Sequence, residues 1–304
     1  MTGLTNVTPT PGPHGGDAHR IAQALDVDPS SFLDLSASLN PVAPDVEALV
    51  ALHLDSLRRY PDADESQRLL AQTIGIEPER LLLTNGGAEA ISLLAQEIDG
   101  HVHEPEFSLH PRGPNSAPLW RSNPHNPSGL LAAPGEHAGV WDEAFFPLAA
   151  GQWTRGDESA LAVVGSLTKL FACPGLRLGY VIAAPDLIDR LEARQPHWSV
   201  GSLALAVLPQ LLTDADLTRW RDEIALLRRE LAEMLESHGL TPLPSDANFL
   251  LCEAPVALRH DLIGQGIVVR DCRSFGLPGH VRIAVPDRRG IERLGNALTL
   301  VMQP

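Results

Sequence analysis

The sequence is poor in lysine: its 304 residues contain one, Lys169, beside 22 arginines. Arginine is permanently charged and is no nucleophile, whereas a partly desolvated lysine amine can lose its proton and attack a carbonyl group. A chain that uses arginine almost everywhere else has therefore kept one side chain whose chemistry arginine cannot replace. This makes Lys169 the first candidate for a catalytic residue, and the alternative is a surface lysine that follows an apolar strand.

Other shortages exclude whole classes of protein. The three cysteines, Cys173, Cys252 and Cys272, are an odd number without metal-ligand spacing, so we expect reduced thiols in a cytoplasmic protein and no metal site. No apolar run reaches the ~18 residues of a membrane span, and the N-terminus lacks a signal-peptide pattern. The net charge of −15 argues against nucleic acid or an anionic membrane as a partner. An anionic substrate then needs a local basic site.

Groups that suit a phosphate monoester stand near Lys169 in the sequence. Ser166 and Thr168 supply hydroxyls just before and beside it, and Arg177 supplies a guanidinium eight residues later. Short hydroxyl donors and a forked arginine are typical of phosphate sites. A nucleophilic amine with a phosphate site around it predicts pyridoxal phosphate (PLP) as the cofactor.

A glycine-rich turn offers a second phosphate contact. The apolar run at residues 81–84 predicts a buried strand, and Gly86, Gly87 and Ala88 open the helix expected after it. Free backbone N–H groups at a helix N-terminus, together with the helix dipole, favour an anion there. Two glycines alone are a weak signal, because many α/β turns contain them.

Residues 166–180 resemble the lysine-bearing segment of the fold-type-I PLP aminotransferase superfamily, and residues 123–129 resemble its Asn-Pro-x-Asn-Pro-Thr-Gly loop. The resemblance implies that Lys169 forms a Schiff base with PLP and that Asn126 hydrogen-bonds the cofactor's phenolate oxygen. It also implies that Asp142, at the end of an expected strand, keeps the pyridine nitrogen protonated, which makes PLP an electron sink.

Two positions depart from the superfamily pattern. Residues 104–110 resemble the segment that sets an aromatic ring on the cofactor, but His110 holds the ring position, and an imidazole stacks less extensively than a phenol. Phe145 stands where relatives often carry a tyrosine, so one hydrogen bond to the phenolate is lost. Tyr60, in a Tyr-Pro pair, resembles the residue that reaches across a dimer interface to the partner's PLP phosphate. The resemblance thus implies a homodimer with shared active sites; alternatively, Tyr60 is an interface aromatic with its hydroxyl in water.

Within the superfamily, residues 14–16, 59–61, 198–204 and 269–277 resemble L-threonine-O-3-phosphate decarboxylases, whose near relatives are histidinol-phosphate aminotransferases. Both bind a phosphorylated amine or amino acid. The predicted substrate-binding residues are His14, Gly15, Asn40, Arg270 and Arg282. In the decarboxylase interpretation, Arg282 binds the carboxylate, and His14 and Arg270 bind the substrate phosphate. Taken alone, either arginine can equally be a solvated strand residue.

Three functions remain open at this stage. The first is PLP-dependent decarboxylation of L-threonine O-3-phosphate to aminopropanol phosphate, in cobalamin biosynthesis. The second is a histidinol-phosphate or related aminotransferase, which differs mainly in the bond that stands perpendicular to the PLP plane. The third is a PLP-fold binding or regulatory protein with little catalysis, which the departures at His110 and Phe145 favour and which the intact Lys169 and Asp142 oppose.

The expected fold is α/β: a large PLP-binding domain with a mostly parallel sheet, and a small α+β domain. We expect residues 1–37 to join the small domain, residues 38–197 to form the large domain, and residues 198–304 to form the interdomain helix and the small domain. The interval from His110 to Asn126 and that from Asn126 to Asp142 are each 16 residues. Both are too short for a crossover helix, since a βαβ unit needs about 30 residues. The large domain is therefore predicted to be trimmed relative to the superfamily.

Overall fold

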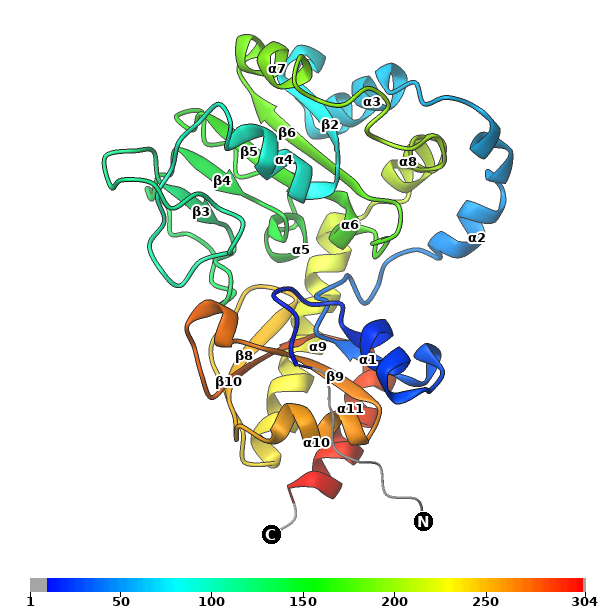
Figure 1. The fold of residues 1–304 in the computed structure, drawn as a ribbon, viewed down its shortest axis with the longest axis vertical. Helices are drawn as coiled ribbons and strands as arrows, with labels where there is room; N and C mark the ends of the chain where they lie inside the picture. The colour runs from blue at the N-terminus through cyan, green and yellow to red at the C-terminus, as the bar shows by residue number, and fades with distance from the viewer. Residues whose placement is uncertain (1–9, 303–304) are drawn as a thin grey trace.

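The computed structural model describes residues 10–302, so the Thr/Pro-rich residues 1–9 and residues 303–304 lie outside the described part. Two five-stranded sheets organise the chain (Figure 1). The first, which we call the Lys169 sheet, has the strand order β2-β6-β5-β4-β3. Its strands are β2 (Leu81–Asn85), β3 (Trp120–Ser122), β4 (Val140–Asp142), β5 (Ala162–Ser166) and β6 (Leu178–Ala183).

The Lys169 sheet is mostly parallel, as predicted. β3, β4 and β5 pair in parallel, and β6 runs antiparallel to both β5 and β2, so only β6 opposes the other four. The carboxyl ends of β2, β4 and β5 therefore meet at one edge, where α/β proteins bind ligands. Asn85, Asp142 and Ser166 are the last residues of these three strands. This edge carries the candidate site.

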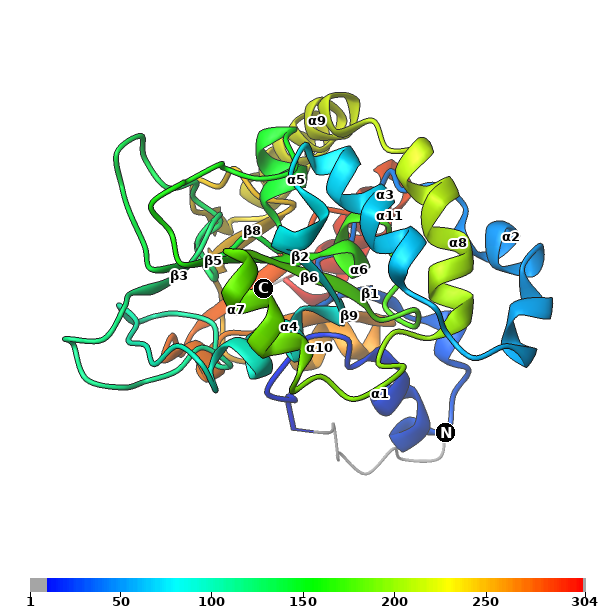
Figure 2. The same ribbon diagram turned by 90° about the horizontal axis from the view of Figure 1, so that it is seen from above.

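Helices cover both faces of the Lys169 sheet (Figure 2). One core contains Ile91, Leu94 and Leu187, so it includes α4 (Gly86–Leu94) and α7 (Pro185–Glu192). The opposite core contains Trp141 and Tyr180 from the strands. The helices on that face are α3 (Asp64–Ile74), α5 (Phe146–Ala150), α8 (Ser202–Thr213) and the first turns of α9 (Leu217–Ser237).

The second sheet, which we call the Arg282 sheet, has the order β1-β9-β10-β8-β7. Its strands are β1 (Leu33–Leu35), β7 (Thr241–Pro242), β8 (Phe249–Glu253), β9 (Ile267–Asp271) and β10 (His280–Ala284). β1 pairs in parallel with β9, so a strand from near the N-terminus completes a sheet built from the C-terminal third. The helices α1 (Ala18–Leu25), α10 (Leu258–Gly264) and α11 (Arg288–Val301) pack beside it.

Helix α9 connects the two halves of the molecule (Figure 1). Trp220 and Ile224 lie in the core of the Lys169 sheet, whereas Leu231 and Leu235 lie in the core of the Arg282 sheet. Asp216 caps the helix by accepting a hydrogen bond from the N–H of Arg219 at 3.1 Å. α8 follows the expected domain boundary at residue 197, yet it packs in the core of the Lys169 sheet. The boundary stays a prediction.

The trimming of the large domain is visible between α4 and α5. From residue 95 to residue 145 the chain forms only β3, β4, an isolated parallel bridge from His101 to Leu119, and loops. His101 thus forms one bridge only, and α4 ends at Leu94.

Residues 45–57 do not form one continuous helix. α2 (Val46–Ala51) ends early and is followed by the 3₁₀ turn η2 (Leu54–Arg58). Short 3₁₀ turns also occur at residues 29–31, 78–80 and 273–275, and α6 (Leu167–Leu170) is a single turn. Among residues 10–302, no helix is long and apolar enough to cross a membrane.

Candidate functional site

Lys169 lies in α6, directly after β5, at the carboxyl edge of its sheet. Burial lowers the pKa of the amine, and the nearby guanidinium groups of Arg282 and Arg177 lower it further, while Asp142 acts in the opposite direction. The Nζ atom lies 5.1 Å from the centre of the Phe145 ring. A buried amine with a lowered pKa more easily reaches the neutral form that attacks a carbonyl group.

Asp142 is the second buried charge of the site, with 8% of its surface exposed. Its Oδ1 accepts a hydrogen bond from the N–H of Ala144 at 3.0 Å, and its Oδ2 lies 3.2 Å from Nε2 of His110. Burial pushes the pKa of this carboxyl upward, but the hydrogen bond and charge of His110, the N–H of Ala144 and the charge of Lys169 together outweigh it, and the pKa ends below its ordinary value. Asp142 is thus held as a carboxylate inside the protein.

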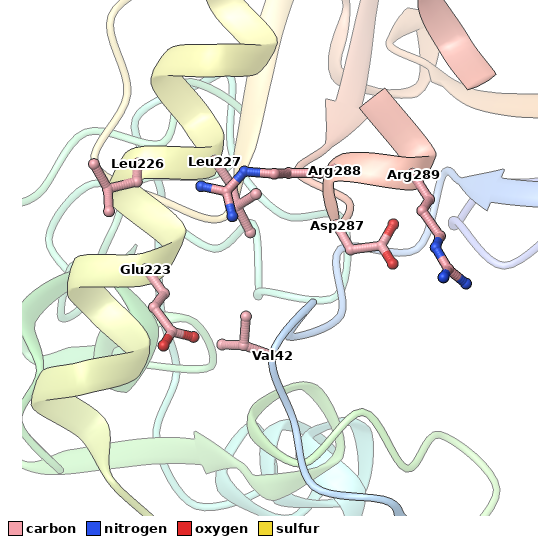
Figure 3. Close-up of a pocket in the computed structure, with 7 residues that line it drawn as sticks. All are labelled: Val42, Glu223, Leu226, Leu227, Asp287, Arg288 and Arg289. Carbon is pink, nitrogen blue, oxygen red and sulfur yellow. The ribbon is translucent and has the colours of Figure 1, made fainter. Parts of the chain in front are cut away.

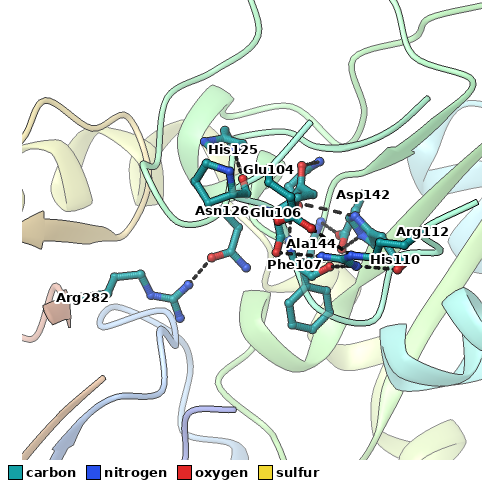
Figure 4. Close-up of polar contacts among 12 residues, drawn as sticks. Glu104, Glu106, Phe107, His110, Arg112, His125, Asn126, Asp142, Ala144 and Arg282 are labelled. Atoms are coloured by element: carbon teal, nitrogen blue, oxygen red, sulfur yellow. Dashed lines mark hydrogen bonds and ion pairs between the residues drawn. The ribbon is translucent and has the colours of Figure 1, made fainter. Parts of the chain in front are cut away.

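His110 was expected to place its ring on the cofactor, and this role stays a prediction. In the structure the ring is 2% exposed and is engaged with Asp142 through Nε2 (Figure 4). Phe107 meets it edge-on with ring centres 5.7 Å apart, and Trp120 lies 5.8 Å away. The hydrogen bond to Asp142 could not be predicted from the sequence, because the two residues are 32 positions apart.

The predicted phosphate-binding groups converge beside Lys169. Arg177 and Gly86 both have left-handed backbone, with φ of 56° and 75°. A Cβ built on Gly86 would come within 2.4 Å of Nη2 of Arg177, so only glycine lets the guanidinium lie against the first turn of α4. A Cβ on Gly87 would lie 3.8 Å from that of Ser166. Arg177, Ser166 and the N-terminus of α4 therefore lie close together.

The hydroxyl of Thr168 is bonded within the protein, and its role at the cofactor phosphate stays a prediction. Its hydroxyl donates to the carbonyl of Leu178 at 3.1 Å and accepts from the N–H of the same residue at 3.3 Å. These two bonds hold the turn that carries Arg177, so the hydroxyl is already engaged. For the hydroxyl of Ser166, by contrast, the part of the chain that the structure describes offers no hydrogen bond. Ala88, in the first turn of α4, is exposed.

Asn126 and Arg282 join the two halves of the molecule. The amide Oδ1 of Asn126 accepts a hydrogen bond from Nη1 of Arg282 (Figure 4). With Oδ1 engaged in this way, the amide NH₂ is the side left to donate to an anionic oxygen. The guanidinium of Arg282 lies 4.4 Å above the ring of Phe249, whose centre is 5.2 Å from that of Phe145. Lys169 and Arg282 thus each lie against one ring of the contacting pair Phe145 and Phe249.

Arg270 lies directly opposite Arg282 on the neighbouring strand. Its Nη2 donates to the carbonyl of Pro13 at 2.7 Å and to the hydroxyl of Ser274 at 3.1 Å. The segment that contains Pro13 also brings His14 to the site, with its ring centre 5.8 Å from that of Phe107. Partial burial lowers the pKa of His14, and Arg270 and Lys169 lower it further.

For three predicted residues, Gly15, Asn40 and Tyr60, the structure shows contacts outside the group around Lys169. A Cβ on Gly15 would come within 2.0 Å of the carbonyl oxygen of Ser36, so this glycine permits close packing of the segment. The side chain of Asn40 donates to the carbonyl of Leu170 at 2.9 Å and accepts from the N–H of Val42 at 3.0 Å, so it braces the turn that carries Lys169. Tyr60 is 80% exposed and contacts Trp198, with ring centres 4.8 Å apart. A role for Tyr60 at the cofactor requires a second copy of the chain.

Sequence reasoning missed Glu106, Phe249 and Ser274, which hold His110, Arg282 and Arg270 respectively. Alternation on β8 places Phe249 on a buried strand, but nothing in the sequence pairs it with Arg282. A separate hollow of about 500 Å³ lies between α9 and the start of α11 (Figure 3). None of its lining residues is a predicted site residue: Val42, Glu223, Leu226, Leu227, Asp287, Arg288 and Arg289.

Comparisons with known proteins identify the family. The sequence profile described as "Aminotransferase class I and II" matches residues 112–298. The threonine-phosphate decarboxylase of Salmonella typhimurium strain LT2 is 30% identical over an alignment that covers 95% of this chain and 96% of the relative. A histidinol-phosphate aminotransferase of Pseudomonas fluorescens is 25% identical, with 89% of each chain covered. The first alignment spans 354 positions, more than the 304 residues here, as expected if this chain lacks segments of its relative.

Solved structures show the same fold. The histidinol-phosphate aminotransferase of Sinorhizobium meliloti, in complex with pyridoxal-5'-phosphate, superposes with a TM-score of 0.79 over 99% of both chains, at 17% identity. The L-threonine-O-3-phosphate decarboxylase of Porphyromonas gingivalis has a TM-score of 0.69 and covers 84% of this chain and 94% of that one, at 22% identity. The architecture is therefore that of fold-type-I PLP enzymes, with a shortened large domain.

The groups at the site fit PLP chemically. A buried amine suits the aldehyde, a carboxylate held in its charged form suits the pyridine nitrogen, and an amide NH₂ suits the phenolate oxygen. A guanidinium beside a helix N-terminus suits the phosphate. The chain belongs to the aminotransferase class I and II family and is a PLP-dependent enzyme.

Proposed function

We propose that this enzyme decarboxylates L-threonine O-3-phosphate, or a closely similar phosphorylated amino acid. The printed name of the Salmonella relative, threonine-phosphate decarboxylase, supports this substrate class. The observation that carries the proposal is the arrangement of Arg270 and Arg282. They lie opposite one another on β9 and β10, and are 5% and 6% exposed.

Two like charges directly across a sheet destabilise it, and buried guanidinium groups need partners. Each of these arginines has an Nε atom without a hydrogen-bond partner among residues 10–302. Burial lowers the pKa of Arg282, and the charge of Arg270 lowers it further. A substrate with two anionic groups supplies the missing negative charge. An O-phosphorylated amino acid has both a carboxylate and a phosphate.

Each anionic group has its own set of donors. Arg282, held by Asn126 and close enough to Lys169 to lower the pKa of its amine, would bind the carboxylate. Arg270 and His14 would bind the phosphate. Because the pKa of His14 is lowered in the free protein, binding of a phosphate dianion favours uptake of a proton by His14.

The Lys169 sheet would hold the cofactor. Ser166, Arg177 and the N–H groups of Gly86, Gly87 and Ala88 would bind its phosphate, Asn126 its phenolate oxygen and Asp142 its ring nitrogen. Bound PLP supplies an acceptor for the electron pair released when a bond to the substrate Cα breaks. Lys169 would carry the proton at Nζ that is returned to Cα, since its lowered pKa makes the amine a better proton donor than an ordinary lysine.

The second candidate is a histidinol-phosphate aminotransferase, favoured by relatives such as that of Pseudomonas fluorescens. An aminotransferase must also accept an amino acid donor, so Arg282 fits that activity too. A third candidate is a PLP-binding protein with little turnover.

Product analysis distinguishes the three. Purified enzyme with O-phosphothreonine should release carbon dioxide and aminopropanol phosphate without any 2-oxo acid. Turnover only with histidinol phosphate and 2-oxoglutarate together would establish the aminotransferase instead. Absence of turnover, with a cofactor absorbance that still responds to phosphorylated amines, would indicate the binding protein.

We also propose that the active enzyme is a homodimer with shared sites. Tyr60 and Trp198 are 80% and 62% exposed, and η2 beside them exposes Leu54 and Leu57 by 53% and 62%. Clustered exposed apolar side chains favour an interface. Sedimentation should show a dimer that Leu57→Glu weakens, while Val256→Glu, at an 87% exposed apolar residue elsewhere, should leave it intact. A fully active monomer would rule the shared site out.

A further inference from the structure

We propose that Glu106 is a positioning residue that acts on the cofactor through His110 and Asp142. Glu106, His110 and Asp142 form a buried row, acid–histidine–acid, which we call the carboxylate relay (Figure 4). Its function is to hold Asp142 charged and aimed at the pyridine nitrogen. The inference concerns cofactor binding, so it holds for a decarboxylase and for an aminotransferase alike.

Glu106 is built into the protein as a hydrogen-bond acceptor. It is 3% exposed. Its Oε1 accepts from the hydroxyl of Ser122 at 2.6 Å and from the N–H of Phe107 at 2.7 Å, and its Oε2 accepts from the N–H of Ser122 at 2.9 Å. A carboxyl group that only accepts hydrogen bonds is stabilised in its ionised form.

His110 lies between the two acids. Its Nε2 is 3.2 Å from Oδ2 of Asp142, and its Nδ1 is 3.9 Å from Oε1 of Glu106. Nδ1 has no hydrogen-bond partner within residues 10–302, and no donor in that range points at it. A nitrogen that faces a carboxylate and no donor is best placed as an N–H. Each ring nitrogen of His110 therefore faces one carboxylate, and a proton on both nitrogens would complete the row.

The loop that carries the relay is fixed by Arg112. Its Nε donates to the side chain of Glu104 at 3.0 Å, its Nη1 donates to the carbonyls of Phe107 and His110, and its Nη2 donates to that of Glu106 at 3.2 Å. Arg112 thus contacts the backbone carbonyl of His110 and not its ring, whose two nitrogens face the two acids.

Other charges near the row lie at its ends. Lys169 is close enough to Asp142 to lower its pKa, and His14 is separated from His110 by the ring of Phe107. Glu106 is therefore the acid on the side of His110 away from Asp142. The hydrogen bond and charge of His110 lower the pKa of Asp142, and Glu106 places a second carboxylate beside the same ring.

Nitrogen-15 NMR of the histidine-labelled holoenzyme tests the relay directly, with the His110 signals assigned through His110→Gln. In the wild-type protein at pH 7.5, both ring nitrogens of His110 should be protonated. In Glu106→Gln, only Nε2 should remain protonated. Ser122→Ala is the matched control, because it removes one donor to Glu106 and keeps the carboxylate charge, so His110 should stay doubly protonated.

A second readout follows the absorbance of the bound cofactor against pH. Glu106→Gln should raise the midpoint pH of this absorbance change by roughly 1 pH unit, the size expected for one nearby charge. The reason is that less positive charge stays on the pyridine nitrogen of the cofactor. In a His110→Gln background the same substitution should cause no further shift. A singly protonated His110 in the wild-type protein overturns the proposal even if Glu106→Gln does not fold. A midpoint shift that persists without His110 overturns it as well.

Discussion

The two walls of the active site differ in how far their polar groups are satisfied. On the Lys169 sheet, Asp142 has two donors, Thr168 is bonded twice to Leu178, and Arg177 lies against Gly86. On the Arg282 sheet, two buried guanidinium groups oppose each other, and each leaves an Nε without a partner in the described chain. The groups just named on the first wall are held within the protein, although the Ser166 hydroxyl and Nδ1 of His110 have no partner among residues 10–302. The second wall holds uncompensated positive charge.

This difference corresponds to two kinds of ligand. A cofactor that stays bound through many turnovers benefits from a preorganised wall, because little reorganisation is needed at each cycle. A substrate that must enter and leave is better bound by charges that it alone neutralises, since the arginines gain partners only in the complex. The predictions below test whether the two walls act separately.

The largest effect is expected from Lys169→Ala. Activity should fall by at least roughly 10²–10⁴-fold, the usual contribution of a positioned proton-transfer group. Borohydride should leave a pyridoxyl group on the Lys169 peptide of the wild-type protein and none on the variant. Lys169→Arg, which keeps the charge, should be equally inactive. Labelling at another residue would refute the assignment of the Lys169 wall to the cofactor.

Arg282→Met separates the walls. Loss of a charge-assisted hydrogen bond worth about 1.5–3 kcal/mol should raise KM roughly 10- to 100-fold, while the cofactor stays bound. The melting temperature of the free protein should hold or rise, because a buried charge without a carboxylate partner is removed. Arg288→Met is the control, since that arginine is exposed and pairs with Glu230. An equal loss of cofactor would contradict the separation.

Sequence reasoning identified the cofactor wall more fully than the substrate wall. The isolated lysine, the strand before it and the glycine turn at Gly86 are local signals, and local geometry places them at one sheet edge. Arg270 and Arg282 were found on their strands, but their opposition depends on a register between β9 and β10 that the sequence does not display. The strand at residues 81–84 was predicted for the same reason, since its apolar run is local.

Contacts between loops could not be predicted. Glu106 meets Ser122, 16 residues away, and His110 meets Asp142, 32 residues away, in a region without periodic pattern. The two bonds between the Thr168 hydroxyl and the backbone of Leu178 could not be predicted either, because a hydroxyl suits a phosphate and a nearby backbone group alike. Helix α2 ends at Ala51, and the leucines of the following η2 stay exposed. These side chains therefore bury no apolar surface that would stabilise a longer helix.

Glu143, directly after β4, defines a stability prediction. Burial raises its pKa to about 7, although the N–H of Arg155 donates to both of its oxygens. A folded-state pKa above the unfolded value means that stability is highest below about pH 4.5 and is lost as the pH rises through about 7. Glu143→Gln should remove that loss, raising the unfolding free energy at pH 8 by up to about 3 kcal/mol.

Denaturant melts at pH 5 and pH 8 measure this effect. The two proteins should differ at pH 8 and be similar at pH 5. Glu158→Gln, at an exposed side chain, is the control and should change neither curve. A wild-type protein that is more stable at pH 8 than Glu143→Gln would reverse the sign and refute the burial argument.

The smallest effect sharpens the comparison within the cofactor wall, at Ser166 and Thr168. Ser166→Ala removes a hydroxyl that has no protein partner among the described residues and should weaken PLP retention by about 1 kcal/mol, with little change in melting temperature. Thr168→Val removes a hydroxyl bonded twice to Leu178 and should lower stability by roughly the same amount. Its direct effect on PLP should be the smaller of the two. PLP retention after dialysis and the melting temperature are measured for both variants. If Thr168→Val loses more PLP and Ser166→Ala loses more stability, Thr168 binds the phosphate and Ser166 only supports the strand.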